Sequence, residues 1–272
     1  MENQISELER VFTLQKNAYR ASHMASYRER IDRIDRIERL TRNNIDKITD
    51  ALQSDFGSRS RDWIFTADIF PQLSHVKKVK KNLRKWMRRE RKSSGLMSVT
   101  GQRTYIVNEP LGVVGIMSPF NAPVSLAFDP AIDALVAGNR AMIKISESTP
   151  RTAELIKRLV AEYFPEEELA VITGGVEVSK AFTSQPWDLL FFTGGSEVGK
   201  HILAATAKNL TPTILELGGK SPCVILDDAD VKSAAAKIGL IRMTNAGQVC
   251  ISGDYVLLPE DKLETFIAEA QS

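Results

Sequence analysis

Short apolar runs alternate with helical patterns from residue 103 to the end of this 272-residue chain. Strands that alternate with helices favour a parallel sheet covered by helices on both faces, so the sequence predicts an α/β fold. The first run of the series lies outside the alternation and predicts an arm or hairpin strand. The predicted strands are Tyr105–Asn108, Val113–Met117, Ala141–Ile145, Ala170–Thr173, Leu189–Thr193, Thr213–Leu217, Cys223–Leu226 and Tyr255–Leu258, and the predicted helices cover 125–137, 151–164, 176–183, 197–208, 229–244 and 260–271.

Residues 1–90 have the apolar spacing of helices. Apolar residues between Tyr27 and Leu52 recur every three to five positions, which predicts one amphipathic stripe, and Gly57 is a predicted helix stop. A second stripe runs from Ile69 to Met87. Residues 77–92 within and after it are strongly basic, which fits either a nucleic-acid surface or the solvated face of a helix. The net charge of +2 favours the solvated face.

Composition excludes several classes of protein. With 43% apolar and 26% charged residues, the chain is typical of globular proteins. No apolar run reaches the roughly 20 residues that span a bilayer, and the N-terminus has no secretory pattern. Two cysteines fit a reducing compartment, so we expect a cytoplasmic location. Two cysteines and three histidines form no cluster with metal-ligand spacing, and we expect no metal site.

Two loops follow predicted buried strands, where open α/β sheets bind ligands. Asn121, between two prolines, offers an amide to an oxyanion, or it is simply a turn residue. At the next strand end, Glu147 can accept hydrogen bonds from ribose hydroxyls, and Lys144 can pair with ribose or phosphate oxygens. The alternative is a helix cap, with Ser146 or Ser148 opening the helix at Pro150.

A third strand runs into the glycine-rich turn Gly194–Lys200, which frees backbone N–H groups for a pyrophosphate at a helix N-terminus. The turn spells GxxxxGK, but His201 stands where a P-loop needs Ser or Thr for magnesium, so an NTPase is disfavoured. A purely structural turn is the alternative.

Two further residues have nucleophile or base character. Glu216 lies in an apolar strand end, where partial burial would suit a general base; the alternative is an acid that points to solvent. Cys250 follows Gly247-Gln248-Val249 and is either a nucleophile near backbone donors or a buried, inert thiol. Cys223, inside an apolar run, fits the buried role.

Taken together and in this order, the motifs resemble the aldehyde dehydrogenase superfamily, and most of all its coniferyl aldehyde dehydrogenases. The LELGGKSP and Gly-Gln-x-Cys stretches are specific when they occur together. The resemblance also includes Asp55-Phe56-Gly57, Pro110–Gly115, Gly138-Asn139-Arg140, Asn209–Pro212 and Asp254-Tyr255-Val256.

This resemblance implies NAD(P)-dependent oxidation of an aromatic or aliphatic aldehyde to its acid, with Cys250 as nucleophile, Glu216 as general base and Asn121 as oxyanion donor. It implies a nicotinamide cofactor and homodimers among full-length members. Glu147 would repel a 2′-phosphate, which favours NAD, and Lys144 nearby keeps NADP as the alternative. From the apolar run lengths and the net charge we expect no membrane and no nucleic-acid partner. The implied cofactor-binding residues are Ser118, Pro119, Phe120, Lys144, Ser146, Glu147, Gly174, Gly194, Gly195, Ser196, Gly199 and Leu217.

The resemblance further implies a domain plan: N-terminal helices over 1–98, an oligomerisation-arm strand over 99–109, a Rossmann-like NAD-binding domain over 110–215 and the start of an α/β catalytic domain over 216–272.

The chain departs from the family pattern at Phe120, Ile145 and Gly195, where the family has Trp, Pro and Ser. Family members continue past the cysteine to a Glu-x-Phe-Gly-Pro stretch that meets the nicotinamide ribose, and this stretch is absent here. We therefore expect a fragment with little or no dehydrogenase activity. The alternative function is that of a non-catalytic nucleotide-binding fragment.

Overall fold

The computed structural model describes residues 2–22 and 24–271. The chain forms two compact units, Met1–Thr193 with Lys200–Leu215 and Gly194–Gly199 with Glu216–Ser272. No helix among the described residues is long and apolar enough to cross a membrane.

A five-stranded sheet forms the centre of the first unit, with strand order β5-β4-β3-β6-β7. The pairings of β3 with β4, β3 with β6 and β4 with β5 are parallel. Every residue of β3 and β4 is buried, as their continuous apolar sequence predicts. The α/β prediction is therefore confirmed. The strands are β3 (Val113–Met117), β4 (Arg140–Lys144), β5 (Leu169–Ile172), β6 (Leu189–Gly194) and β7 (Thr213–Leu217).

The strand order reverses at β3, because the chain adds β4 and β5 on one side of it and β6 and β7 on the other. Such a switch point is where open α/β sheets bind ligands, outside the carboxyl ends of the strands. The loop after β3 starts at this point. The loop therefore lies where ligands commonly bind in this class of fold, whichever side chains it carries.

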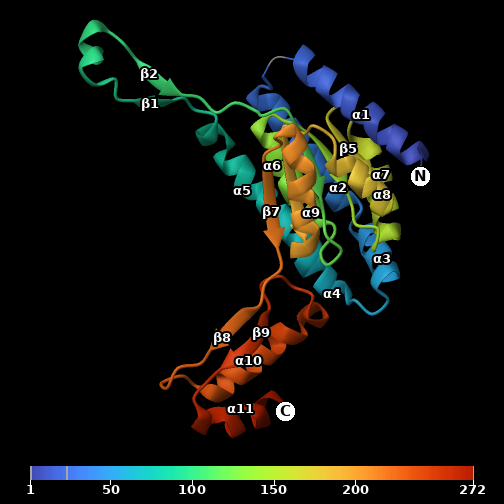
Figure 1. Ribbon diagram of the computed structural model, residues 1–272, viewed down its shortest axis with the longest axis vertical. Coiled ribbons are helices and arrows are strands. Elements are labelled where there is room, and N and C mark those ends of the chain that lie inside the picture. Colours follow the sequence, from blue (N-terminus) through green and yellow to red (C-terminus); the bar gives the residue numbers. More distant parts are fainter. Residues whose placement is uncertain (1, 23, 272) are drawn as a thin grey trace. The chain divides into compact units, whose positions relative to one another are not determined.

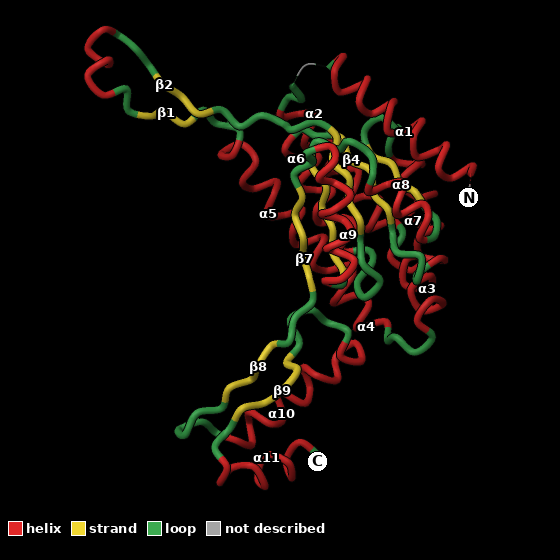
Figure 2. Tube along the Cα trace, viewed as in Figure 1, coloured by secondary structure: helices red, strands yellow, loops and turns green. Residues whose placement is uncertain are grey.

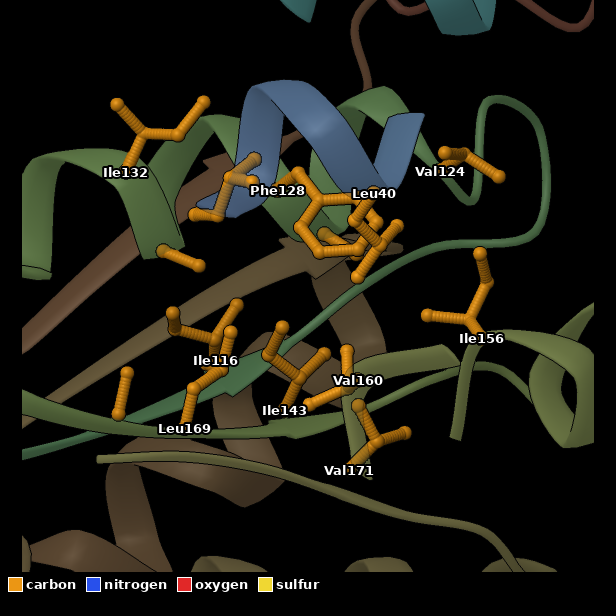
Figure 3. Close-up of a cluster of buried hydrophobic side chains, with 14 of the residues drawn as sticks. Leu40, Ile116, Val124, Phe128, Ile132, Ile143, Ile156, Val160, Leu169 and Val171 are labelled. Carbon is orange, nitrogen blue, oxygen red and sulfur yellow. The ribbon is translucent and has the colours of Figure 1, made fainter. Parts of the chain in front are cut away.

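Helices cover the sheet and extend its core, as Figures 1 and 3 show. Helix α6 (Ser125–Ala137) is apolar on nearly all sides because it contacts β3 and β4 as well as α2 and α5. Phe128 of α6 is fully buried against this layer. The other helices that follow strands are α7 (Pro150–Tyr163), α8 (Val176–Thr183) and α9 (Ser196–Thr206), which is followed by η3 (Ala207–Asn209).

The predicted amphipathic stripe of residues 27–52 is divided between two helices, α2 (Tyr27–Asn43) and α3 (Ile45–Phe56), so the expectation of one stripe on one helix is wrong. Asn44 causes the break. Its side-chain amide donates to the carbonyl oxygen of Leu40 at 2.9 Å, and its own backbone leaves the helical region with φ −129°. Gly57 ends α3 with φ 74°, as predicted. The remaining N-terminal elements are α1 (Glu2–Ala21), α4 (Arg61–Ile64), the π-helix η1 (Phe65–Ile69) and α5 (Phe70–Trp86).

Helix α5 presents its apolar stripe, including Val76 and Val79, to the core. Lys80 on this helix is paired with Asp35 and Glu38 of α2. After α5, β1 (Glu90–Lys92) pairs antiparallel with β2 (Thr104–Ile106), and η2 (Gly95–Thr100) lies between them (Figure 2). The predicted hairpin strand is thus confirmed, while the charged sequence of β1 had no strand signal.

The second unit contains a parallel pair, β8 (Ser221–Val224) and β9 (Gly253–Leu257). Two helices, α10 (Val231–Met243) and α11 (Leu263–Ala270), pack on each other. Short turns η4 (Thr244–Gly247) and η5 (Glu260–Lys262) connect these elements.

Candidate active site

The loop after β3 is held in place from several sides. The backbone N–H of Ser118 donates to the carbonyl oxygen of Lys144 at 3.0 Å, which ties the ends of β3 and β4 together. Further along, Arg59 donates from Nη2 to the carbonyl oxygen of Asn121 at 2.7 Å. Asn121 is half-buried and Phe120 is exposed. The Oγ of Ser118 is buried, and it has no hydrogen-bond partner among the described residues.

Lys144 and Glu147 form an ion pair of 2.6 Å at the end of β4. The Lys144 side chain is 2% exposed, whereas that of Glu147 is 46% exposed. Partial burial raises the pKa of Glu147, but the hydrogen bond from Lys144, a backbone hydrogen bond and the Lys144 charge together lower it below its usual value. The result is an ionised, accessible carboxylate held by a buried cation.

The helix that follows, α7, is not capped by either predicted serine. Its N-cap is Thr149, without a side-chain cap, and the Oγ of Ser146 instead accepts from the N–H of Ser148 at 3.3 Å. The carboxylate of Asp55, at the end of α3, accepts from the N–H of Arg151 at 3.1 Å and of Thr152 at 2.8 Å. A residue distant in sequence therefore caps α7, and the expected local cap is wrong.

Gly174 follows β5 with φ +144°. A Cβ at this position would lie 2.5 Å from Cγ2 of Val178, so both the backbone conformation and the packing of α8 require glycine there.

The glycine-rich turn of the second unit leads directly from β6 into α9. β6 ends at Gly194, α9 begins at Ser196, and the N–H of Gly199 donates to the carbonyl oxygen of Gly195 at 3.0 Å. A Cβ added at Gly195 would meet nothing within 4 Å, so packing does not explain this glycine. The turn therefore leaves room beside its backbone.

Glu216 is exposed, together with Ile214, because alternate residues of β7 point to the same side. The hypothesis of partial burial is therefore wrong for this chain, and the carboxylate points to solvent. Leu217, next along the strand, is half-buried.

Cys250 is exposed and follows a strained turn. Asn245, Ala246 and Gly247 all have left-handed backbone, with φ of 51°, 55° and 76°. Left-handed backbone costs roughly 1–2 kcal/mol for residues other than glycine, so the surrounding turn must hold it. A Cβ at Gly219 would lie 3.8 Å from the carbonyl oxygen of Cys250, which brings the LELGGK and Gly-Gln-x-Cys stretches together.

Cys223 has a different environment. It is half-buried on β8, and a Cβ added at Gly253 of β9 would lie only 2.4 Å from its Sγ. Both cysteines are free thiols. Within the described ranges 2–22 and 24–271, no group of His, Cys, Asp and Glu side chains is arranged to hold a metal ion.

Sequence reasoning missed three residues of the first unit that hold the segments after β3 and β4 in place: Asp55, Arg59 and Asp68. Asp68 is fully buried, and its carboxylate accepts from the backbone N–H groups of Val124 and Ser125. Asp55 stood in a recognised motif without an assigned role. Arg59 and Asp68 had no sequence signal, because a charged residue beside an apolar helical stripe usually faces solvent.

The aldehyde dehydrogenase family matches residues 2–272 of the chain. A probable coniferyl aldehyde dehydrogenase of Pseudomonas aeruginosa is 41% identical over 98% of this chain and 56% of its own length. The coniferyl aldehyde dehydrogenase of a Pseudomonas species is 45% identical over 84% of this chain and 47% of its own length. The chain thus spans about half the length of these relatives.

Solved structures of aldehyde dehydrogenases are also similar to this chain. A substrate-bound Staphylococcus aureus AldH superposes with a TM-score of 0.93 at 33% identity, over 97% of this chain and 57% of its own. A Mycobacterium tuberculosis aldehyde dehydrogenase complexed with NAD+ has a TM-score of 0.88 at 28% identity, over 98% of this chain and 55% of its own. With the match of the family over the whole chain, these likenesses show that the protein belongs to the aldehyde dehydrogenase family.

Proposed function

We propose that this chain supplies the NAD-binding part and the nucleophile of an enzyme that oxidises an aldehyde to its carboxylic acid. The observation that carries the proposal is the position of Cys250, an exposed thiol after a strained turn and beside Gly219 of the LELGGK stretch. Backbone strain is typically maintained at functional sites. Coniferyl aldehyde and related aromatic or aliphatic aldehydes are the proposed substrate class, from the relatives at 41% and 45% identity.

The residues at the ends of β3 and β4 fit a dinucleotide. Glu147 offers an ionised acceptor for ribose hydroxyls, and Lys144 holds it in place. The orphaned Oγ of Ser118 fits a ligand with polar groups beside this strand end. A 2′-phosphate would be repelled by Glu147, so NAD is favoured over NADP. Pro119, Phe120, Ser146, Gly174, Gly194, Gly195, Ser196, Gly199 and Leu217 complete the proposed cofactor site.

The chemistry follows from the side chains. The Cys250 thiolate attacks the aldehyde carbonyl, and the carbonyl oxygen becomes an oxyanion bound by the Asn121 amide and the Cys250 backbone N–H. When bound, nicotinamide would supply the acceptor for the hydride. The tetrahedral thiohemiacetal on Cys250 would give up its C–H hydride as the oxyanion re-forms a carbonyl, which leaves a thioester on Cys250. Glu216 takes a proton from water, which attacks the thioester and releases the acid and the thiolate.

The domain plan is part of the proposal. Helices over 1–98 support an NAD-binding domain over 110–215, and 216–272 begin the catalytic domain. Residues 99–109 serve as an oligomerisation arm in a homodimer, as supported by the exposed apolar side chains of Val99, Ile106 and Val107. The two free thiols support a location in the reducing cytoplasm.

The test is production of NADH and of carboxylic acid from coniferyl aldehyde by the purified 272-residue chain, at a rate that we expect to be far below that of a full-length relative. Cys250→Ser should abolish both products, and Cys223→Ser, the matched control, should leave them. Turnover that survives Cys250→Ser would refute the assigned nucleophile.

A second candidate function is nucleotide binding without catalysis. The exposure of Glu216 favours it, because partial burial is what would suit a carboxylate to general-base work. Titration calorimetry with NAD separates the two. Binding that Glu147→Ala weakens, with no aldehyde turnover, supports this second function.

A further inference from the structure

We propose that Arg59 and Asp68 are positioning residues that fix the direction of the Asn121 side chain. The inference rests on the proposed role of Asn121 as oxyanion donor, and it adds two residues to which that function assigns nothing. Both lie in the segment between α3 and α5, which contacts the loop after β3.

Asp68 anchors the end of this loop. Its Oδ1 accepts from the N–H of Val124 at 3.0 Å and of Ser125 at 3.3 Å, at the N-terminus of α6. The π-helix η1 places both Asp68 and its neighbour Ile69 in the interior, with no exposure. Burial raises the pKa of Asp68 to about 6, while the two orphan N–H groups at the helix N-terminus and the Arg59 charge oppose that shift.

Arg59 anchors the start of the loop. One guanidinium nitrogen lies 3.4 Å from Oδ2 of Asp68, and another donates to the carbonyl oxygen of Asn121 at 2.7 Å. The guanidinium stacks on the Phe56 ring, with Cζ 3.4 Å from the ring centroid, and the Arg59 side chain is only 3% exposed. The Gln53 amide donates to the Arg59 carbonyl oxygen at 3.2 Å. The guanidinium group of Arg59 is therefore held by Asp68 and the Phe56 ring as well as by its hydrogen bond to the loop.

The hydrogen bond from Arg59 to the main-chain oxygen of Asn121 restrains the Asn121 side chain through the backbone. Pro119 and Pro123 have restricted φ, and each disfavours helical backbone in the residue before it. Asn121 lies between these restricted positions. Because the peptide unit is planar, a hydrogen bond to the Asn121 carbonyl restrains the plane of the peptide that follows Asn121, and with it the position of the Cα that carries the side chain. Arg59 thus restrains the main chain of Asn121, a residue that the two prolines do not themselves restrict.

The Arg59→Lys variant distinguishes a positioning role of Arg59 from simple charge pairing with Asp68. Arg59→Lys keeps a cation for Asp68 but has no planar fork to reach the carbonyl as well. Arg61→Lys is the matched control, because Arg61 is 51% exposed and pairs with Asp46 and Asp50 on the surface. Asn121→Ala and the double variant complete the set.

The chemical probe is p-nitrophenyl acetate, which needs no cofactor. The Cys250 thiolate attacks the ester carbonyl through an oxyanion, the acyl C–O bond breaks, and p-nitrophenolate leaves. Iodoacetamide is the reference reagent, because the thiolate displaces iodide without forming an oxyanion. We expect Arg59→Lys to slow acylation about 10- to 100-fold and Asn121→Ala about 100- to 1,000-fold. Alkylation should change less than about twofold in every variant, since the thiolate itself is untouched.

The double variant is the decisive arm. If Arg59 acts through Asn121, Arg59→Lys should add no further loss on top of Asn121→Ala. Multiplied losses, or an Arg59→Lys rate equal to that of Arg61→Lys, would overturn the inference. If Asn121→Ala acylates normally, the proposed oxyanion role itself fails, and that outcome differs from a failure of Arg59 alone.

Hydrogen–deuterium exchange decides the inference even if the wild-type chain is not acylated. Arg59→Lys and Asp68→Asn should speed exchange in peptides covering 118–125 and leave 126–137 protected. Unchanged exchange in 118–125, or equal loss of protection along the whole of α6, would show a merely structural pair.

Discussion

Removal of the Asp55 carboxylate tests whether α7 is capped from a distance. Asp55 accepts two N–H hydrogen bonds at the helix N-terminus, at 3.1 and 2.8 Å, while the predicted cap Ser148 offers its Oγ to neither. Loss of an N-cap costs about 0.5–2 kcal/mol, and loss of a charge at the positive end of the helix adds about 0.3–1 kcal/mol. Since the two effects overlap, we expect Asp55→Ala to lower the free energy of unfolding by about 1–2 kcal/mol.

Tryptophan fluorescence is the suitable assay, because Trp63, Trp86 and Trp187 all lie in the first unit and report its unfolding. At about 2–4 °C per kcal/mol, Asp55→Ala should lower the melting temperature by roughly 2–8 °C. Asp55→Asn should fall between it and wild type, and Ser148→Ala, the control, should change stability by less than about 0.5 kcal/mol. A destabilising Ser148→Ala beside a neutral Asp55→Ala would refute the reasoning.

Three further predictions follow from the packing, from a buried charge and from the two thiols. A Cβ at Gly115 would lie 2.7 Å from atoms of the Trp187 ring, so Gly115→Ala should cost about 1–3 kcal/mol in urea unfolding; an equal loss in Gly195→Ala, where the space is open, would argue against steric overlap. Burial raises the pKa of Asp129 to about 6, with His75 opposing and Asp133 reinforcing the shift. Because the folded pKa of Asp129 exceeds its unfolded pKa, protonated Asp129 contributes its full stabilisation below about pH 4. This stabilisation, about 3 kcal/mol, is lost as the pH rises through about 6. Asp129→Asn should therefore gain stability relative to wild type between pH 5 and pH 8 in urea unfolding, and a gap that is the same at both pH values would contradict this. Iodoacetamide should alkylate Cys250 roughly ten times faster than Cys223, judged by exposure and resolved by peptide mass mapping; preferential labelling of Cys223 would reverse the assignment.

Local sequence patterns predicted most of the secondary structure. Strand β3 was predicted with its observed bounds because a short apolar run rich in β-branched residues, between Gly112 and Pro119, is typical of a buried strand. The division of residues 27–52 at Asn44 was missed, because periodicity does not register a side chain that competes for backbone hydrogen bonds. β1 was missed because its only strand signal is its pairing with β2.

The candidate site divides in the same way. Asn121, Glu147 and Cys250 were proposed from loops that follow strands and from glycine-rich turns, since residue type and chain position carry that signal, and their roles stay predictions. The exposure of Glu216 was not predictable, because alternation along a strand does not say which side is covered.

The sequence alone determined the α/β alternation, the buried strands and the family motifs, because hydrophobic periodicity and turn chemistry act over a few residues. Only the tertiary structure decided what holds these motifs in place. Asp55 reaches α7 across 97 positions of sequence, and Arg59 reaches Asn121 across 62. Such contacts depend on which helices the core brings together. No local sequence pattern therefore predicts a hydrogen bond between residues that are distant in the sequence.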